Sequence, residues 1–175
     1  MNKILCIIGC SKSKTKTPAK AIECYSTSPQ FRLCKNIAEQ LKADIVILSS
    51  KYGFLSPDTL IEPYNDTWQE YPRYMRDISK EERQRIDEFN KKTINEMIEK
   101  AKQSHPDFSK YDRVVILAPY HNTKRILKKS KLYEDRFEFW FKGAKGCFDM
   151  KRHLNIRLEN ELMFQEEKEK NKNEI

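Results

Sequence analysis

The side chains of this sequence that could carry out chemistry are concentrated in a few short polar segments, the first of which spans residues 9–14. That segment places one cysteine, two serines and two lysines in direct succession after a glycine. Such a loop can bind a phosphate or a carboxylate through its backbone N–H groups and lysine charges. We therefore predict ligand contacts from Ser11, Lys12 and Ser13. The spacing is not that of a Walker motif, and a solvated turn is the alternative.

Cys10, in the same loop, is a candidate catalytic nucleophile. Neighbouring lysines and loop N–H groups would stabilise its thiolate and so raise its reactivity. The alternative is a small structural residue buried at the end of a strand. The five cysteines of the chain show no Cys-x-x-Cys spacing, so neither a zinc site nor a disulfide framework is predicted.

The second polar segment follows the apolar run 44–49 and combines a lysine, aromatic rings and carboxylates. We predict that Lys51 binds phosphate and that Tyr52 and Tyr64 flank a nucleobase. Asp58 is a candidate catalytic acid or base in the same stretch. The alternative is that the aromatic rings only close the hydrophobic core.

Two later segments add an imidazole and a flexible backbone. His121 follows the apolar run 113–118 and is a candidate catalytic acid or base, because imidazole titrates near neutral pH. A structural role is the alternative for a lone histidine. Glycine lets the backbone approach a ligand closely, which predicts ligand contacts at Gly53 and in the late segment, at Lys142, Gly143 and Gly146.

The elements that must position these segments follow from the hydrophobic pattern. Short continuous apolar runs indicate buried strands, and apolar residues at three- and four-residue steps indicate helices. Such runs predict buried strands at 3–9, 44–49 and 113–118, and alternating charged and aromatic residues predict a partly exposed strand at 136–141. The predicted helices are 28–43, 79–101, 123–132 and 150–164. This order predicts an α/β fold, a three-layer Rossmann-like domain with a mostly parallel sheet of about four strands. Ligands of such sheets bind at the carboxyl ends of the strands, which is where the polar segments lie.

The length of 175 residues suits a single domain, which we place at residues 1–164. Residues 165–175 are almost wholly polar and are predicted to form a disordered tail. No window is apolar enough for a membrane span and no signal-peptide pattern opens the chain, so a cytoplasmic protein without a membrane partner is expected.

The charge balance favours polyanionic partners. The net charge is +8, but the segment 159–175 carries six acids and three lysines and contributes −3, which leaves +11 on the remainder. Nucleic acid and phosphorylated small molecules are the partners that such a surface attracts.

Taken together, these segments resemble a bacterial and phage family of small uncharacterised domains. The resemblance rests on Cys-Ser-Lys-Ser-Lys at residues 10–14, Ser-Ser-Lys-Tyr-Gly-Phe-Leu at 49–55 with Pro-Asp at 57–58, and the glycine-bearing segment 142–146. It runs nearly end to end and leaves out only the acidic tail. That family has no firm activity, so this resemblance implies no specific reaction.

More distantly, the chain is similar to the core domain of archaeosine synthase. The shared pattern is Cys-Ser followed by a tyrosine and a serine, then Tyr-Gly-x-x-x-Pro and a Pro-Tyr pair. This similarity implies amidine formation on a nitrile-bearing deazaguanine in RNA, with functional residues at Cys10, Ser11, Tyr25 and Ser28. The Lys-Pro-Tyr of that family is missing after Cys10. A weaker similarity to peroxide-stress proteins of the YaaA type implies nucleic-acid binding.

The preferred hypothesis is a small enzyme that acts on a nucleobase, nucleoside or nucleotide, either free or within DNA or RNA. Two alternatives stay open: a non-catalytic basic protein that binds nucleic acid, and a nucleotide-sensing module of a phage-related system. The sequence predicts no metal site, and it specifies neither a cofactor nor an oligomeric state.

Overall fold

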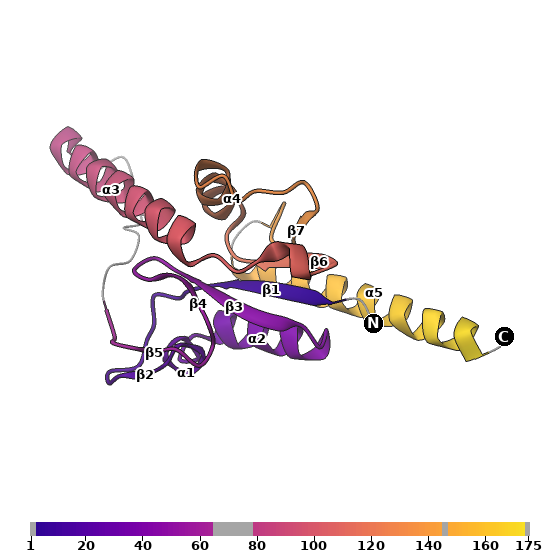
Figure 1. Ribbon diagram of the computed structural model, residues 1–175. Helices are drawn as coiled ribbons and strands as arrows, with labels where there is room; N and C mark the ends of the chain where they lie inside the picture. Colours follow the sequence, from indigo (N-terminus) through magenta and orange to yellow (C-terminus); the bar gives the residue numbers. More distant parts are fainter. Residues whose placement is uncertain (1–2, 65–78, 145–146, 174–175) are drawn as a thin grey trace.

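The computed structural model describes residues 3–64, 79–144 and 147–173. Its main sheet has five strands in the order β4-β3-β1-β6-β7, and only β4 runs antiparallel to its neighbour. The strands are β1 (Ile4–Gly9), β3 (Asp44–Ser49), β4 (Gly53–Leu55), β6 (Arg113–Leu117) and β7 (Phe137–Phe139) (Figure 1). The predicted α/β class with a mostly parallel sheet is confirmed.

A second, smaller sheet and five α-helices complete the described fold. The small sheet pairs β2 (Ala19–Lys20) antiparallel with β5 (Leu60–Ile61). The helices are α1 (Ala21–Tyr25), α2 (Pro29–Gln40), α3 (Lys80–Ser104), α4 (Tyr120–Lys129) and α5 (Cys147–Asn173), with a 3-10 turn, η1, at Phe108–Lys110. Within the described residues, none of the helices combines the length and the apolar composition that crossing a membrane requires.

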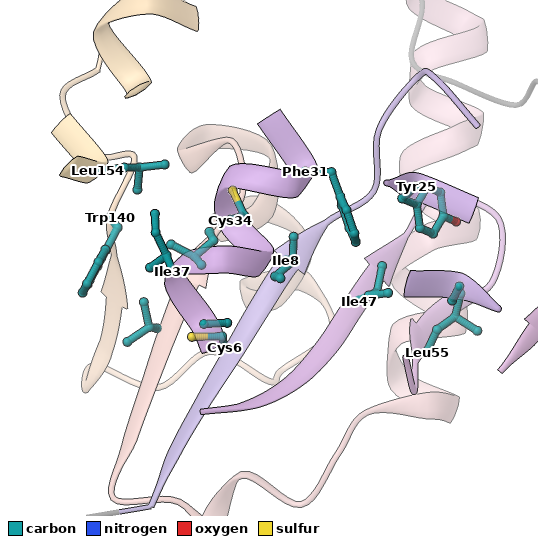
Figure 2. Packing of buried hydrophobic residues seen from close by; sticks show 14 of the residues in the cluster. Cys6, Ile8, Tyr25, Phe31, Cys34, Ile37, Ile47, Leu55, Trp140 and Leu154 are labelled. Carbon is teal, nitrogen blue, oxygen red and sulfur yellow. The ribbon is translucent and has the colours of Figure 1, made fainter. Parts of the chain in front are cut away.

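Strand β1 lies in the middle of the main sheet and is buried on both faces. Its alternate side chains point to opposite sides, as the two-residue period of a strand requires. Cys6 and Ile8 pack in a cluster with α2 and α5, whereas Leu5 and Ile7 pack in a cluster with α3 and α4 (Figures 1 and 2). Burial on both faces explains why the run 3–9 is continuously apolar rather than alternating.

Helix α2 packs on the sheet through one apolar face. Phe31, Cys34 and Ile37 recur at three-residue steps and are buried over β1 and β3 (Figure 2). The hydroxyl of Ser28 accepts a hydrogen bond from the backbone N–H of Phe31 at 3.4 Å, so Ser28 caps the helix. Pro29 follows at the first helical position, where a missing N–H costs nothing.

Strand β4 corrects the prediction of about four strands. The sequence predicts a loop at residues 53–55, but this segment pairs with the end of β3 as an antiparallel edge strand. Three residues are too few to show a hydrophobic period. The strand forms because Phe54 and Leu55 are buried in the core, which only the tertiary structure reveals.

Helix α4 begins three residues earlier than the predicted start at Thr123. Pro119 occupies the N-cap position, and its carbonyl accepts a hydrogen bond from the N–H of Thr123 at 3.1 Å. His121 therefore lies in the first turn of a helix rather than in a loop. In β7, Phe137 and Phe139 are buried and Glu138 between them is half-buried, which agrees with the partly exposed strand that the alternating sequence predicts.

An arginine ties α5 to the sheet at the amino end of β6. The guanidinium of Arg113 donates to Glu138 of β7 at 2.8 Å and to Glu161 of α5 at 2.5 Å. Burial opposes ionisation of Glu138, but the hydrogen bonds and charge of Arg113, together with smaller contributions from Trp140 and Arg157, lower the pKa of the carboxyl. Helix α5 continues to Asn173, through most of the segment 165–175, whose disorder stays a prediction.

Replacement of Gly53 by alanine should destabilise the fold, because the position has a φ of 75° and lies against α3. A Cβ there would be 2.5 Å from the Ser104 hydroxyl and 2.8 Å from the Lys100 carbonyl carbon. We expect Gly53→Ala to lower the free energy of unfolding by more than about 2 kcal/mol in urea denaturation.

The matched control is Gly143→Ala. Gly143 also has a positive φ, 91°, but a Cβ added there would meet no heavy atom within 4 Å. Gly143→Ala should lower the free energy of unfolding by only about 1–2 kcal/mol, which is the cost of a side chain at a positive φ. Equal losses at the two positions would contradict the close packing of Gly53 on α3.

Two buried thiols should make stability fall at alkaline pH. Burial is the main cause that raises the pKa of Cys6 and of Cys34 from 9.0 to about 12. Above pH 9 the unfolded chain therefore loses protons that the folded chain retains, so the stabilisation present below pH 9 is lost as pH rises toward 12.

Each thiol should lower the free energy of unfolding by up to about 1.4 kcal/mol per pH unit in that range. Urea unfolding of wild type and Cys34→Ala between pH 8 and pH 11 measures this loss. The variant should show the shallower decline, and parallel profiles would argue against the buried thiols as its source.

Candidate functional site

A pocket of about 430 Å³ opens at the carboxyl ends of β1, β3 and β6. Its walls come from the loop Gly9–Lys12, from Leu48 and Ser50 at the end of β3, and from the segment 118–126. Met97 of α3 closes a further side. Parallel strands end at the same edge of a sheet, so loops that are distant in sequence meet there.

Gly9 lets β1 and β6 end close together beside the pocket. A Cβ at Gly9 would lie 2.9 Å from the Cβ of Ala118, closer than packed carbon atoms tolerate. Both residues line the pocket. A larger side chain at either position would therefore push the strand ends apart and change the shape of the pocket.

The pocket walls combine apolar side chains with polar groups and are almost uncharged. Apart from Lys12, the polar lining residues offer thiol, hydroxyl or amide groups: Cys10, Ser11, Ser50, Asn122 and Thr123. Among the residues that the structure describes, no carboxylate or imidazole lines the pocket, and no group of three or more acidic, histidine or cysteine side chains could hold a metal ion. The pocket is therefore built to form neutral hydrogen bonds beside a single cation.

Cys10 is half-buried, and its thiol lies against Ser50. Its Sγ donates to the Oγ of Ser50 over 3.8 Å, and the Ser50 hydroxyl donates to the phenol oxygen of Tyr64 at 3.4 Å. The backbone N–H of Cys10 donates to the carbonyl of Leu48 at 3.0 Å, which extends the pairing of β1 with β3. The main chain and one hydroxyl thus hold the thiol at the pocket wall.

Behind Ser50, three buried hydroxyls form a closed hydrogen-bonded ring. Tyr25 donates to Ser49 at 3.1 Å, Ser49 lies 2.8 Å from Tyr64, and Tyr64 lies 2.7 Å from Tyr25. Each hydroxyl can donate one bond and accept another, so all three are satisfied within the ring. Ser49 also accepts the backbone N–H groups of Lys51 and Tyr52, at 3.2 Å each, which fixes the turn after β3.

Burial keeps both tyrosines of this hydroxyl ring protonated. Desolvation is the largest cause that raises the pKa of Tyr25 and of Tyr64 above the ordinary value of 10.0. A charge on Cys10 would raise both pKa values further. Neither phenol therefore accepts a proton at neutral pH, and their role is to hold neighbouring groups in place.

Two lysines and the rings of Tyr25 and Tyr52 surround Tyr64. The Nζ atoms of Lys14 and Lys51 lie 4.2 and 5.4 Å from its ring centroid, within the range of cation–π contacts. The ring of Tyr52 packs edge-on, with centroids 5.4 Å apart. Only 7% of Tyr64 is exposed, so a nucleobase could stack on this ring only after one of the lysines moved.

The first turn of α4 adds a favourable end for an anion. Pro119, Asn122 and Thr123 line the pocket, and Pro119 offers no side chain that could cap the helix. The N–H groups of a first helical turn lack intrahelical acceptors and carry partial positive charge. Together with Lys12, this turn would stabilise a phosphate or carboxylate at the edge of the pocket.

Three of the predicted site residues, Cys10, Ser11 and Lys12, line the pocket. Ser13 is exposed beside them, and its carbonyl accepts a hydrogen bond from the Ser11 hydroxyl at 2.7 Å. The Ser28 hydroxyl is engaged as the cap of α2. The structure therefore brings Cys10, Ser11 and Lys12 together at the pocket, whereas Ser13 and Ser28 lie outside its lining.

The two other candidate catalytic groups lie outside the pocket lining. Asp58 is exposed and forms an ion pair with Lys20 at 2.9 Å, next to the small sheet. His121 is exposed and packs its ring edge-on against Tyr120, with centroids 5.1 Å apart. Their predicted roles as acid or base stay predictions.

The glycine-bearing segments also differ in position. The close contact of Gly53 is with α3, and not with the pocket. Lys142 and Gly143 are exposed in the turn after β7, and the Lys142 charge acts on the phenol of Tyr120. Gly146 lies outside the described residues.

A sequence profile for a family of unknown function (DUF6884) matches residues 5–145, which is most of the chain. The chain belongs to the DUF6884 family. Membership of an uncharacterised family confirms that part of the predicted resemblance. The matched range of the DUF6884 domain contains every residue that lines the pocket.

Among curated proteins, the uncharacterized protein YfjM of Bacillus subtilis (strain 168) is similar to this DUF6884 domain. The two are 40% identical over 65 residues, which cover 34% of this chain and 43% of YfjM. No solved structure matches the chain significantly. None of these matches bears on the archaeosine synthase similarity, which stays a prediction.

Sequence reasoning did not select several pocket residues of the DUF6884 domain. Ser50 and Asn122 adjoin predicted site residues at the ends of strands, and this position is the sequence signal that points to both. Met97 occupies an ordinary core position of α3 in the sequence pattern. Only the packing of α3 on the sheet brings Met97 to the pocket.

Removal of the Tyr64 hydroxyl should destabilise the domain, because it leaves the buried hydroxyls of Ser49 and Tyr25 each with one partner fewer. We expect Tyr64→Phe to cost about 1–3 kcal/mol in urea denaturation. In a double-mutant cycle with Ser49→Ala, the coupling should be at least about 0.5 kcal/mol.

Tyr133→Phe is the control for this cycle. Within the described structure, the Tyr133 hydroxyl makes no hydrogen bond, although its ring contacts Phe137 and Phe139. Its loss should change stability by less than about 0.5 kcal/mol. Equal effects of the two substitutions would contradict the hydroxyl ring.

Proposed function

We propose that this domain is a small enzyme that binds a nucleobase, nucleoside or nucleotide in the pocket at the carboxyl ends of β1, β3 and β6. The observation that carries the proposal is the mixed chemistry of the pocket: neutral hydrogen-bonding groups, apolar side chains and the single cation of Lys12. We also infer the Rossmann-like, three-layer organisation in which such a site is typical.

The size and composition of the pocket support a nucleobase. A volume of about 430 Å³ falls in the range of small-molecule sites. Leu48, Met97 and Ile126 offer apolar surface to a planar ring. Ser50 and Asn122 offer hydrogen bonds to the polar edge of that ring.

The position of the charges supports a phosphate at one side of the pocket. Lys12 is exposed in the loop after β1, and the first turn of α4 contributes to the same pocket lining. Both favour an anion. A nucleotide would therefore place its base among the neutral groups and its phosphate toward Lys12.

Cys10 is the group for which we propose a covalent role. Its thiol lines the pocket and is the only nucleophile there with a strong intrinsic reactivity among the described residues. The contact with Ser50 orients the thiol. Asp58 and His121 stay candidates for proton transfer in a ligand complex that extends beyond the pocket.

The proposal predicts that a bound ligand protects Cys10 from alkylation. Wild type is treated with iodoacetamide with and without nucleosides, nucleotides or deazaguanines, and labelling of the peptide that contains Cys10 is followed by mass spectrometry. Buried Cys6, Cys24 and Cys34 should label slowly in either case. A compound at 100 times its Kd should also stabilise the fold by about 2.7 kcal/mol.

Lys12→Ala and Lys16→Ala form a matched pair for this experiment. Both lysines are exposed in the same loop, but only Lys12 lines the pocket. Lys12→Ala should weaken protection by a nucleotide more than by its nucleoside, and Lys16→Ala should change neither. A compound that stabilises the protein without protecting Cys10 binds elsewhere and counts against the proposal.

A further inference from the structure

Helix α4 carries a concentrated positive charge next to the pocket. The segment 120–131 contains five cations and no carboxylate: Lys124, Arg125, Lys128, Lys129 and Lys131. None of the five forms an ion pair within the residues that the structure describes. Helix α3, by contrast, has seven cations and six acids, with ion pairs such as Lys92–Glu96.

One row of these cationic side chains runs along α4 away from the pocket. Asn122 lines the pocket, and Arg125 and Lys129 follow it at three and seven residues, on the same side of the helix. Both cations are exposed. The row extends roughly 10 Å along the helix axis, at about 1.5 Å per residue. At about 3.4 Å per nucleotide, that length matches two to three nucleotides of a stacked strand.

A second row is held in place by aromatic rings. The Nζ of Lys124 donates to the hydroxyl of Tyr120 at 2.9 Å and lies 5.5 Å from the centroid of Tyr133, which also contacts Lys128 at 5.2 Å. This hydrogen bond, followed by the charges of Lys124, Lys142 and Lys128, lowers the pKa of the Tyr120 phenol despite some desolvation. The potential around the start of α4 is therefore positive.

We infer that the ligand of the pocket is a nucleotide within a single-stranded nucleic acid, whose phosphates lie along the Asn122–Arg125–Lys129 row while one base enters the pocket. This inference rests on the proposed function of the pocket. A free mononucleotide would leave Arg125 and Lys129 without a partner, whereas a strand supplies phosphates for both.

A single strand fits better than a duplex or a membrane. A base can enter a pocket only when it is out of the stack, which costs least in a single strand. A membrane-binding helix needs an exposed apolar face. The apolar residues of α4, Ile126 and Leu127, are buried in the core.

Fluorescence anisotropy with labelled single-stranded DNA and RNA oligonucleotides tests this inference at about 50 and 200 mM salt. Arg125→Gln/Lys129→Gln should weaken binding at least tenfold. It should also reduce the slope of log K against log salt by about 1.4, because each phosphate contact contributes about 0.7. Thermal midpoints of the variants show that the fold is kept.

The matched control is Arg85→Gln/Lys91→Gln, which removes one arginine and one lysine from exposed positions of α3. This variant should bind within about twofold of wild type, because charge loss far from the contact is screened. Equal weakening by both pairs would overturn the inference in favour of unspecific attraction. Tighter binding to duplex, or to phosphatidylserine vesicles, would also overturn it.

Protection of Cys10 by a mononucleotide separates this inference from the proposed function. If protection persists in the α4 double variant while oligonucleotide binding is lost, both are supported. If protection occurs but oligonucleotide binding does not depend on α4, only the strand inference fails. If oligonucleotides bind through α4 and no nucleotide protects Cys10, the pocket proposal fails and the entry of a base fails with it.

Discussion

The burial of β1 on both faces, at the centre of the sheet, is the constraint on which the rest of the structure depends. One set of its side chains packs with α2 and α5, and the other packs with α3 and α4. Packing on both faces fixes the position of β1 in the sheet, and therefore the position of its carboxyl end. That place is Gly9, where the absence of a side chain lets Ala118 of the neighbouring strand end approach. This close approach of the two strand ends places Gly9, Cys10 and Ala118 in the wall of one pocket.

The loops around the pocket are held by hydrogen bonds between segments that are distant in the chain. Tyr25, Ser49 and Tyr64 come from α1, β3 and the segment after β5, yet their hydroxyls close one ring. Such a ring is stable only when every member is present, because an unpaired buried hydroxyl is costly. Through Ser50, the same ring reaches the thiol of Cys10.

The charges of the molecule are arranged differently at the two ends of β6. At its amino end, Arg113 is neutralised by Glu138 and Glu161 and serves to attach α5. Beyond its carboxyl end, the cations of α4 have no such partners among the described residues. The paired charges at the amino end stabilise the fold. The cations of α4 give a positive electrostatic potential outside the protein, because no acid among the described residues neutralises them.

The sequence by itself determined the α/β class, the buried strands and the loop that carries Cys10, because these depend on local pattern and composition. It could not determine β4, the start of α4 at Tyr120 or the hydroxyl ring. Those features arise where segments far apart in the chain meet, and a sequence pattern records no such contact. For the same reason only the tertiary structure decided that Asn122, rather than His121, faces the pocket.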